Sequence, residues 1–278
     1  MTLDPHLSTG TWEDRIQSDL LIGLSQSDPE GKPIPGMAER WDISPDGLTW
    51  TFHLRQALWS DGVPVTADDF VYSFRRLLDP KTASIYAYLL YVIEGGQAVN
   101  EGKAPLSSLG ARALDPLTLE IRLAHPAPYL PELTKHQSFF PAPKHVVEKY
   151  GDGWVKPGRM VSNGPFKLTA WRLGDRITVE KNPWFWDAAK VCLDRVNFYP
   201  TPDVVSAERR VARGAGLDQG DVPPGVRLQH LARPFQAVGP ADAHRARVAD
   251  HVAVGDQIAI ARDQEAAAMP LVGLHQDH

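Results

Sequence analysis

Alternating hydrophobic and polar positions predict strands at several places in the first 200 residues. Within residues 48–54, four apolar side chains alternate with three polar ones, which is the period of a half-buried strand. The turn sequence Pro45-Asp46-Gly47 precedes it. The same alternation predicts a strand over 117–123 and a hairpin formed by 166–170 and 176–180. A further strand is predicted over 195–199.

Helical periodicity is clearest after Thr66, which is a predicted N-cap with Asp69 three positions later, as in a capping box. Pro80 predicts the end of this helix. One helix face carries the apolar residues Phe70, Val71, Phe74, Leu77 and Leu78. Shorter helices are predicted from Pro143 to Tyr150, ended by Gly151, and from Asp203 to Gly214. Three prolines argue against regular structure in the loop that they share: Pro126, Pro128 and Pro131.

Composition narrows the class of protein. The chain has 278 residues, of which 43% are hydrophobic, so a sizeable core is expected. A net charge of -5 disfavours a nucleic-acid partner, which requires a basic surface. No apolar run is long enough for a membrane span, and no signal peptide is visible before Asp4. The single cysteine, Cys192, excludes an internal disulfide and is expected to be buried. Strands and helices are mixed without a regular βαβ alternation, which predicts an α/β fold with mixed sheets.

The composition changes towards the C-terminus. Residues 226–278 contain five of the ten histidines, whereas the last lysine is Lys190 and the last tryptophan is Trp186. Only 252–260 is typical of a strand or a buried turn. Our hypothesis is that 226–278 is an unassigned tail, out of frame or disordered. The alternative is an ordinary C-terminal region with weak patterning.

Several motifs occur in a specific order and spacing, each weak alone. They are Leu3-Asp4-Pro5-His6, 35–41 (PGMAERW), 46–55 (DGLTWTFHLR), 59–62 (WSDG), 65–73 (VTADDFVYS), 161–166 (VSNGPF) and 181–186 (KNPWFW). Over about residues 1 to 215, the chain resembles the family 5 solute-binding proteins, which serve oligopeptide, dipeptide and nickel ABC transporters. Three stretches resemble the oligopeptide branch of this family most: 79–84 (DPKTAS), 109–110 and 151–154 (GDGW).

The resemblance implies a periplasmic-binding-protein-like fold of type II, in which a peptide lies between two lobes that close on a hinge. It implies that residues 1–21 begin lobe I, that 22–144 form a small additional domain, and that 145–225 continue lobe I. The second lobe is not recognisable, so the chain resembles a fragment with impaired binding. The implied partners are an oligopeptide ligand and the permease subunits of an ABC importer. The implied state is a periplasmic or cell-surface monomer without cofactors.

The resemblance also indicates ligand-binding residues. The segment Thr9-Gly10-Thr11 corresponds to one that runs along the bound peptide in the oligopeptide branch. Gly10 matches that branch and permits close backbone approach, whereas Thr9 replaces an acidic residue often found there. Tyr86 falls where such receptors carry a ligand-contacting tyrosine, and the alternative is a half-buried aromatic in a helical stretch. Trp41 and Trp59 are expected in the core, and Asn163-Gly164-Pro165 is expected to be a structural turn.

Motifs for catalysis and metal binding are absent from the sequence: there is no G-x-S-x-G, H-E-x-x-H, P-loop or G-x-G-x-x-G. Helix capping accounts for Asp68 and Asp69 better than paired catalytic carboxylates do. The spacing of His275 and His278 could hold a metal, but no carboxylate or cysteine supports a specific site. His53 is expected to face solvent, and no partner for Lys135 or His136 is visible. The alternatives to an oligopeptide receptor are a receptor for a dipeptide, nickel or another solute, a non-functional remnant, and a hydrolase.

Overall fold

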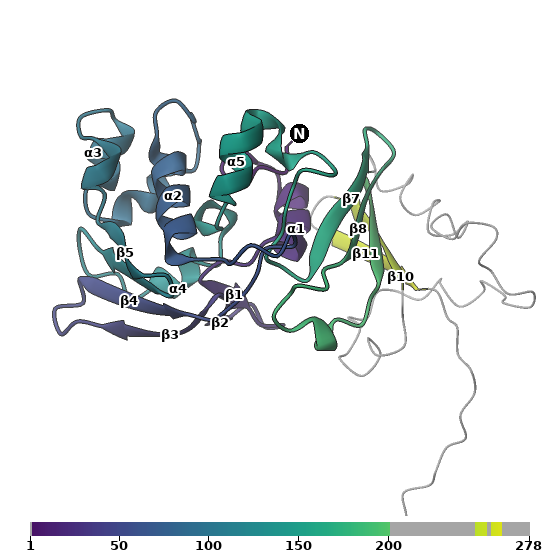
Figure 1. Ribbon diagram of the computed structural model, residues 1–278, viewed down its shortest axis with the longest axis horizontal. Coiled ribbons are helices and arrows are strands. Elements are labelled where there is room, and N and C mark those ends of the chain that lie inside the picture. Colours follow the sequence, from purple (N-terminus) through teal and green to yellow (C-terminus); the bar gives the residue numbers. More distant parts are fainter. Residues whose placement is uncertain (1, 201–247, 255–256, 263–278) are drawn as a thin grey trace, which may run out of the picture.

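Two larger sheets flank a group of helices in the computed structural model, which describes residues 2–200, 248–254 and 257–262 (Figure 1). The first sheet is antiparallel and has the strand order β3-β4-β6-β5. Its strands are β3 (Ala38–Ile43), β4 (Thr49–Leu54), β5 (Ala111–Asp115) and β6 (Thr118–Arg122). Trp50, Phe52 and Leu54 are buried on one face of β4. The predicted strands over 48–54 and 117–123 are therefore confirmed.

Helix α2 (Ala67–Leu78) packs against β5 and β6, and its apolar face is buried as predicted. The Thr66 backbone N–H donates to the Asp69 carboxylate at 2.9 Å, which confirms the capping box. The same carboxylate accepts the indole N–H of Trp59 at 3.4 Å. Trp59 is fully buried, as predicted, whereas Trp41 is half-buried and packs against the core.

Short helices connect these elements. They are η1 (Ala87–Val92), α3 (Gly96–Asn100), η2 (Leu106–Ser108), α4 (Leu130–Leu133), η3 (Gln137–Phe139), α5 (Lys144–Tyr150), η4 (Gly151–Val155) and η5 (Ala188–Lys190). Helix α5 confirms the predicted helix after Pro143, and Gly151 ends it with a φ of 53°. The expectation of no regular structure around the three prolines was wrong at α4. Pro131 stands in the first turn of α4, where its missing N–H has no helical partner to lose.

The second sheet is mixed and has the order β11-β10-β9-β8-β7. Its strands are β7 (Phe166–Arg172), β8 (Arg176–Lys181), β9 (Arg195–Pro200), β10 (Val248–Val254) and β11 (Gln257–Arg262). The predicted hairpin is the antiparallel pair β7–β8, and the predicted strand over 195–199 is β9. Strand β10 pairs with β9 in parallel and with β11 antiparallel. The combination of sheets and helices confirms the predicted α/β class. Of the sheets that the structure describes, this second one is mixed and the other two are antiparallel.

Several sequence-based predictions concern the C-terminal region. The segment 252–260, expected to be a strand or a buried turn, spans the end of β10 and the start of β11, which are two antiparallel strands. The helix predicted from Asp203 to Gly214 lies outside the described residues, as do His275 and His278. Whether 226–278 is out of frame stays a hypothesis. Cys192 is half-exposed in the loop before β9, so the expectation of a buried cysteine was wrong. The loop lies at the surface, where Lys190 and Asp194 are exposed as well.

Helix α1 (Thr11–Leu20) lies between the two larger sheets (Figure 1) and was not predicted. A short antiparallel pair follows it, β1 (Ser25–Ser27) with β2 (Pro33–Pro35). The Ser25 hydroxyl lies 2.7 Å from the Thr134 hydroxyl and donates to the Pro131 carbonyl at 2.6 Å. These contacts join the chain just after α1 to the end of α4.

Candidate functional site

The first residues form a buried turn. The carbonyl of Asp4 accepts hydrogen bonds from the backbone N–H groups of Leu7 at 3.1 Å and Ser8 at 2.9 Å. One carboxylate oxygen of Asp4 also accepts the backbone N–H of His6 at 3.0 Å. Aspartate and proline favour such a turn, since aspartate bonds its own following backbone and Pro5 fixes φ. The Asp4-Pro5-His6 motif thus shapes the chain immediately before Thr9.

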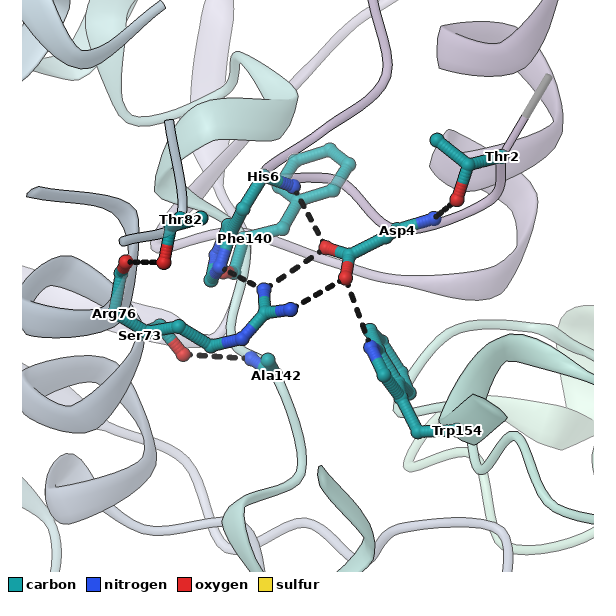
Figure 2. Close-up of polar contacts among 9 residues, drawn as sticks. All are labelled: Thr2, Asp4, His6, Ser73, Arg76, Thr82, Phe140, Ala142 and Trp154. Atoms are coloured by element: carbon teal, nitrogen blue, oxygen red, sulfur yellow. Dashed lines mark hydrogen bonds and ion pairs between the residues drawn. The ribbon is translucent and has the colours of Figure 1, made fainter. Parts of the chain in front are cut away.

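A buried ion pair fixes this turn to α2 (Figure 2). The Arg76 guanidinium donates to both carboxylate oxygens of Asp4, at 3.0 Å from Nη1 and 2.6 Å from Nη2. The Trp154 indole N–H donates to the same carboxylate at 2.9 Å. Burial tends to raise the pKa of Asp4, but the hydrogen bonds and charge of Arg76 outweigh it and hold that pKa below its usual value. Asp4 is therefore ionised at neutral pH.

His6 completes the group. Its Nδ1 lies 2.7 Å from Nη1 of Arg76, and its Nε2 lies 3.4 Å from the carbonyl oxygen of Phe140. Because a guanidinium only donates, Nδ1 must accept and the proton must be on Nε2, which then donates to Phe140. Burial, followed by the Arg76 charge, lowers the pKa of His6 to about 4. His6 is therefore neutral at physiological pH.

The predicted ligand segment follows directly. Thr9 is exposed, Gly10 immediately precedes α1, and Thr11 is the exposed first residue of that helix. The Glu13 carboxylate lies where a Cβ on Gly10 would project, so a larger residue at position 10 would displace it. Tyr86 is half-buried just before η1, and its hydroxyl donates to the Thr9 carbonyl at 3.4 Å. The structure thus brings together Thr9 and Tyr86, which are 77 positions apart.

His136 lies beside this pair and was not identified from the sequence. Its ring packs edge-on against Tyr86 with 5.3 Å between ring centroids, and its Nδ1 accepts the Ser138 backbone N–H at 3.2 Å. Burial lowers the pKa of His136, and the charge of Asp14 opposes that shift. The expectation that Lys135 and His136 have no partners was therefore wrong, since Lys135 pairs with Glu132 at 2.6 Å. Local sequence gave no signal, because the contacts of His136 with Tyr86 and Asp14 are tertiary.

Other predicted residues have structural roles. The Asn163 side chain bonds to the backbone of Ile22, consistent with a structural turn at 163–165. His53 is not simply solvated, because its Nε2 lies 2.7 Å from the carboxylate of Asp42 on the neighbouring strand β3. In the part of the chain that the structure describes, no three histidine, cysteine or acidic side chains gather to hold a metal ion. A pocket of about 460 Å³ is lined by Trp184 and Trp186, among others, but by none of the predicted ligand residues.

Comparison with known proteins shows what this arrangement is similar to. The family model described as bacterial extracellular solute-binding proteins, family 5 Middle, matches residues 32–237. The periplasmic oligopeptide-binding protein OppA of Salmonella typhimurium is 47% identical over 216 residues, which are 77% of this chain and 40% of OppA. The oligopeptide-binding protein OppA of Bacillus subtilis is 36% identical over 228 residues, which are 80% of this chain and 42% of that relative.

Solved structures agree. Haemophilus influenzae OppA in complex with the peptide RPPGFSPFR aligns with a TM-score of 0.75 and 42% identity over 78% of this chain and 43% of that chain. The murein tripeptide binding protein MppA of Escherichia coli gives a TM-score of 0.74 and 40% identity over 77% of this chain and 42% of that chain.

These likenesses confirm the predicted periplasmic-binding-protein-like fold. The chain spans about 40% of the length of the curated relatives that it matches. Those relatives are named as binding proteins, and the family is one of solute-binding proteins. No helix among the described residues is long and apolar enough to cross a membrane. With most of its length matched by the family model, the chain belongs to the family 5 bacterial extracellular solute-binding proteins.

Proposed function

We propose that this chain supplies part of the ligand site of an oligopeptide receptor that delivers peptides to an ABC importer. The observation that carries the proposal is the approach of the Tyr86 hydroxyl to the Thr9 carbonyl. It brings together two segments that were both predicted, from the resemblance, to contact a peptide. The 42% identity with an OppA structure that holds the peptide RPPGFSPFR supports the same ligand class.

The proposed ligand residues are Thr9, Gly10, Thr11 and Tyr86. Thr9 and Thr11 are exposed, so this segment is accessible to an extended peptide. Pairing through main-chain hydrogen bonds would give affinity that depends little on peptide sequence. Gly10 has no side chain to hold a peptide backbone away, and Tyr86 adds an aromatic surface and a hydroxyl.

A second candidate is a receptor for another solute. The probable deoxycholate-binding periplasmic protein YgiS of Escherichia coli is 42% identical over 216 residues, close to the values for the oligopeptide-binding relatives. A dipeptide-binding protein of Lactococcus lactis is 34% identical over 203 residues. Ligand class therefore varies among relatives of this similarity, and titration with different solutes separates the candidates.

We infer further that the protein works without catalysis, as a periplasmic or cell-surface monomer with ABC permease subunits as partners. The binding-protein names of the relatives and the periplasmic location stated for several of them support this. The division into 1–21, 22–144, 145–225 and 226–278 belongs to the same proposal. Consistent with it, the β3-β4-β6-β5 sheet falls within 22–144 and the β7–β9 strands fall within 145–225.

Isothermal titration with mixed di- to pentapeptides tests the proposal, with circular dichroism on the same sample to show that it is folded. The informative variant is Tyr86→Phe, which removes the hydroxyl that bonds to Thr9. The matched control is Tyr91→Phe, because the Tyr91 hydroxyl donates to Asn100 instead, at 2.8 Å. We expect peptide affinity to fall about threefold to tenfold in Tyr86→Phe, as for one lost hydrogen bond, and to stay unchanged in Tyr91→Phe. A folded chain that binds none of the peptides would overturn the proposal.

A further inference from the structure

Arg76 contacts the N-terminal turn through its side chain and the loop before Tyr86 through its backbone. Its guanidinium makes two hydrogen bonds to Asp4 and lies 2.7 Å from Nδ1 of His6, and the Arg76 side chain is only 14% exposed. These contacts fix the turn from Asp4 to Ser8, whose next residue is Thr9. The guanidinium is planar, so a two-pronged pair with a carboxylate sets orientation as well as distance.

The backbone of Arg76 contacts the segment that leads to Tyr86. Its carbonyl accepts the Thr82 hydroxyl at 2.5 Å (Figure 2). The same carbonyl accepts the Asp79 backbone N–H at 3.3 Å. The Thr82 backbone N–H in turn donates to the Asp79 carbonyl at 2.9 Å. The chain therefore leaves α2 along a path fixed by Arg76 and reaches Tyr86 four residues after Thr82.

The two paths meet again where the Tyr86 hydroxyl donates to the Thr9 carbonyl. Arg76 thus contacts two segments, the 4–8 turn through its side chain and the 79–82 loop through its backbone. These segments lead to Thr9 and Tyr86, which contact each other. A shift of Arg76 relative to either segment would move Thr9 relative to Tyr86, although the hydrogen bonds of the Arg76 side chain go to Asp4 and His6 and not to these two residues.

The energy of the Asp4–Arg76 ion pair indicates that it orients the two segments more than it stabilises the fold. Burying two charges costs desolvation that their attraction barely repays, so such pairs add little net stability. Their directional hydrogen bonds nevertheless restrict geometry, and here Asp4 is also held by Trp154 and by the His6 backbone. A buried bidentate pair next to proposed ligand residues therefore has a clear consequence for the shape of the site.

We propose that Arg76 is a positioning residue of the peptide site, which sets the separation of Thr9 and Tyr86 by holding the 4–8 turn and the 79–86 loop at once. This inference rests on the proposed function for its effect on ligand. The control of the Thr9–Tyr86 contact by Arg76 is a property of the folded chain and does not depend on bound peptide.

Two variants test it. Arg76→Lys keeps the charge that pairs with Asp4 but loses the planar fork. Thr82→Val keeps the shape of the side chain and removes only the hydroxyl bond to the Arg76 carbonyl. The control is Thr169→Val, because the Thr169 hydroxyl also donates to a backbone carbonyl, that of Thr178 at 3.2 Å, within the β7–β8 hairpin.

Three quantities are measured for each full-length variant: the melting temperature, the affinity for mixed tri- to pentapeptides well below that temperature, and the nuclear Overhauser effect between the Tyr86 ring and Thr9 without peptide. We expect Arg76→Lys to weaken the Overhauser effect and to lower affinity about tenfold while the protein stays folded, with a smaller change of the same kind in Thr82→Val. Thr169→Val is expected to change neither.

Unchanged Overhauser effect and affinity in folded Arg76→Lys and Thr82→Val would overturn the inference. Equal losses in Thr169→Val would also overturn it, because they would show a general response to destabilisation. If the parent chain binds no peptide, the proposed function fails, and the Overhauser effect alone decides whether Arg76 sets the Thr9–Tyr86 contact.

Discussion

The side chain of Asn163 pairs with the backbone of Ile22 through two hydrogen bonds, although 141 positions separate the two residues. Its Nδ2 donates to the Ile22 carbonyl and its Oδ1 accepts the Ile22 N–H, both at 3.0 Å. The side-chain amide of Asn163 thus makes the two hydrogen bonds to Ile22 that the backbone of an adjacent strand would otherwise make. Both residues are buried, so no water replaces these bonds if they are lost.

Asn163→Ala is expected to lower the free energy of unfolding by about 2–4 kcal/mol, because it leaves a buried N–H and a buried C=O without partners. Urea unfolding followed by circular dichroism measures the loss. The comparison variant is Asn100→Ala, which removes a bond to the Leu78 carbonyl and the acceptor of the Tyr91 hydroxyl. Because Asn100 is only half-buried, water can replace these bonds and a smaller loss is expected. A loss below that of Asn100→Ala would contradict the structural role of Asn163.

Neutral His6 predicts a specific dependence of stability on pH. Its pKa falls from 6.5 to about 4 on folding, so the unfolded chain binds the extra proton first as pH decreases. The contribution of His6 to stability is therefore full above about pH 6.5 and declines by about 1.4 kcal/mol per pH unit down to about pH 4, below which nothing more is lost from this group. The loss from His6 alone is about 3 kcal/mol.

Chemical unfolding at a series of pH values measures this slope, and His6→Gln provides the comparison because it cannot titrate. We expect the decline between pH 6.5 and pH 4 to be shallower in His6→Gln. Parallel curves for the two proteins would show that His6 is not the titrating group. Asp4 does not interfere, because its pKa lies below the usual value of 3.8. Burial raises the pKa of Asp19 to about 7, and this carboxyl is present in both proteins, so the difference between the two curves reports His6.

The capping box of α2 predicts unequal roles for two adjacent aspartates. Asp69 is buried and accepts hydrogen bonds from Thr66 and Trp59, whereas Asp68 is exposed in the same helical turn. Asp69→Ala is expected to cost about 1–2 kcal/mol in the free energy of unfolding, through the lost cap and the unpaired indole N–H. Asp68→Ala removes only a favourable interaction with the helix dipole, so thermal unfolding should show a loss below about 1 kcal/mol. Equal losses would contradict the cap geometry.

Local patterns were sufficient where one face of an element is uniformly apolar, as in β4 and α2. Helix α1 was missed because its buried face includes Glu13 and Gln17 beside Ile16 and Leu20, so no continuous apolar stripe is visible in the sequence. Short-range rules therefore recovered β4, β6 and α2, which bury hydrocarbon on one face, and missed α1, which also buries polar groups.

The candidate site was less accessible to such reasoning. Thr9, Gly10, Thr11 and Tyr86 came from the family resemblance, and the structure joins Thr9 to Tyr86. Nothing in the sequence places His136 beside Tyr86, since no periodicity or motif links positions 50 residues apart. Likewise, Arg76 has the spacing of an ordinary charge near a helix end, and only the fold brings Asp4 to it.

The contact of Ser25 with Thr134 has a consequence for how the chain reaches its native state. Closing a loop from Ile22 to Asn163 directly would cost conformational entropy that grows with the logarithm of the loop length. If the intervening stretch folds first, the Ser25–Thr134 contact brings the two ends of that stretch together, and the loop that remains to close is much shorter than the direct one. The β7–β8 hairpin would then dock against α1 only after the stretch between Ser25 and Thr134 has folded.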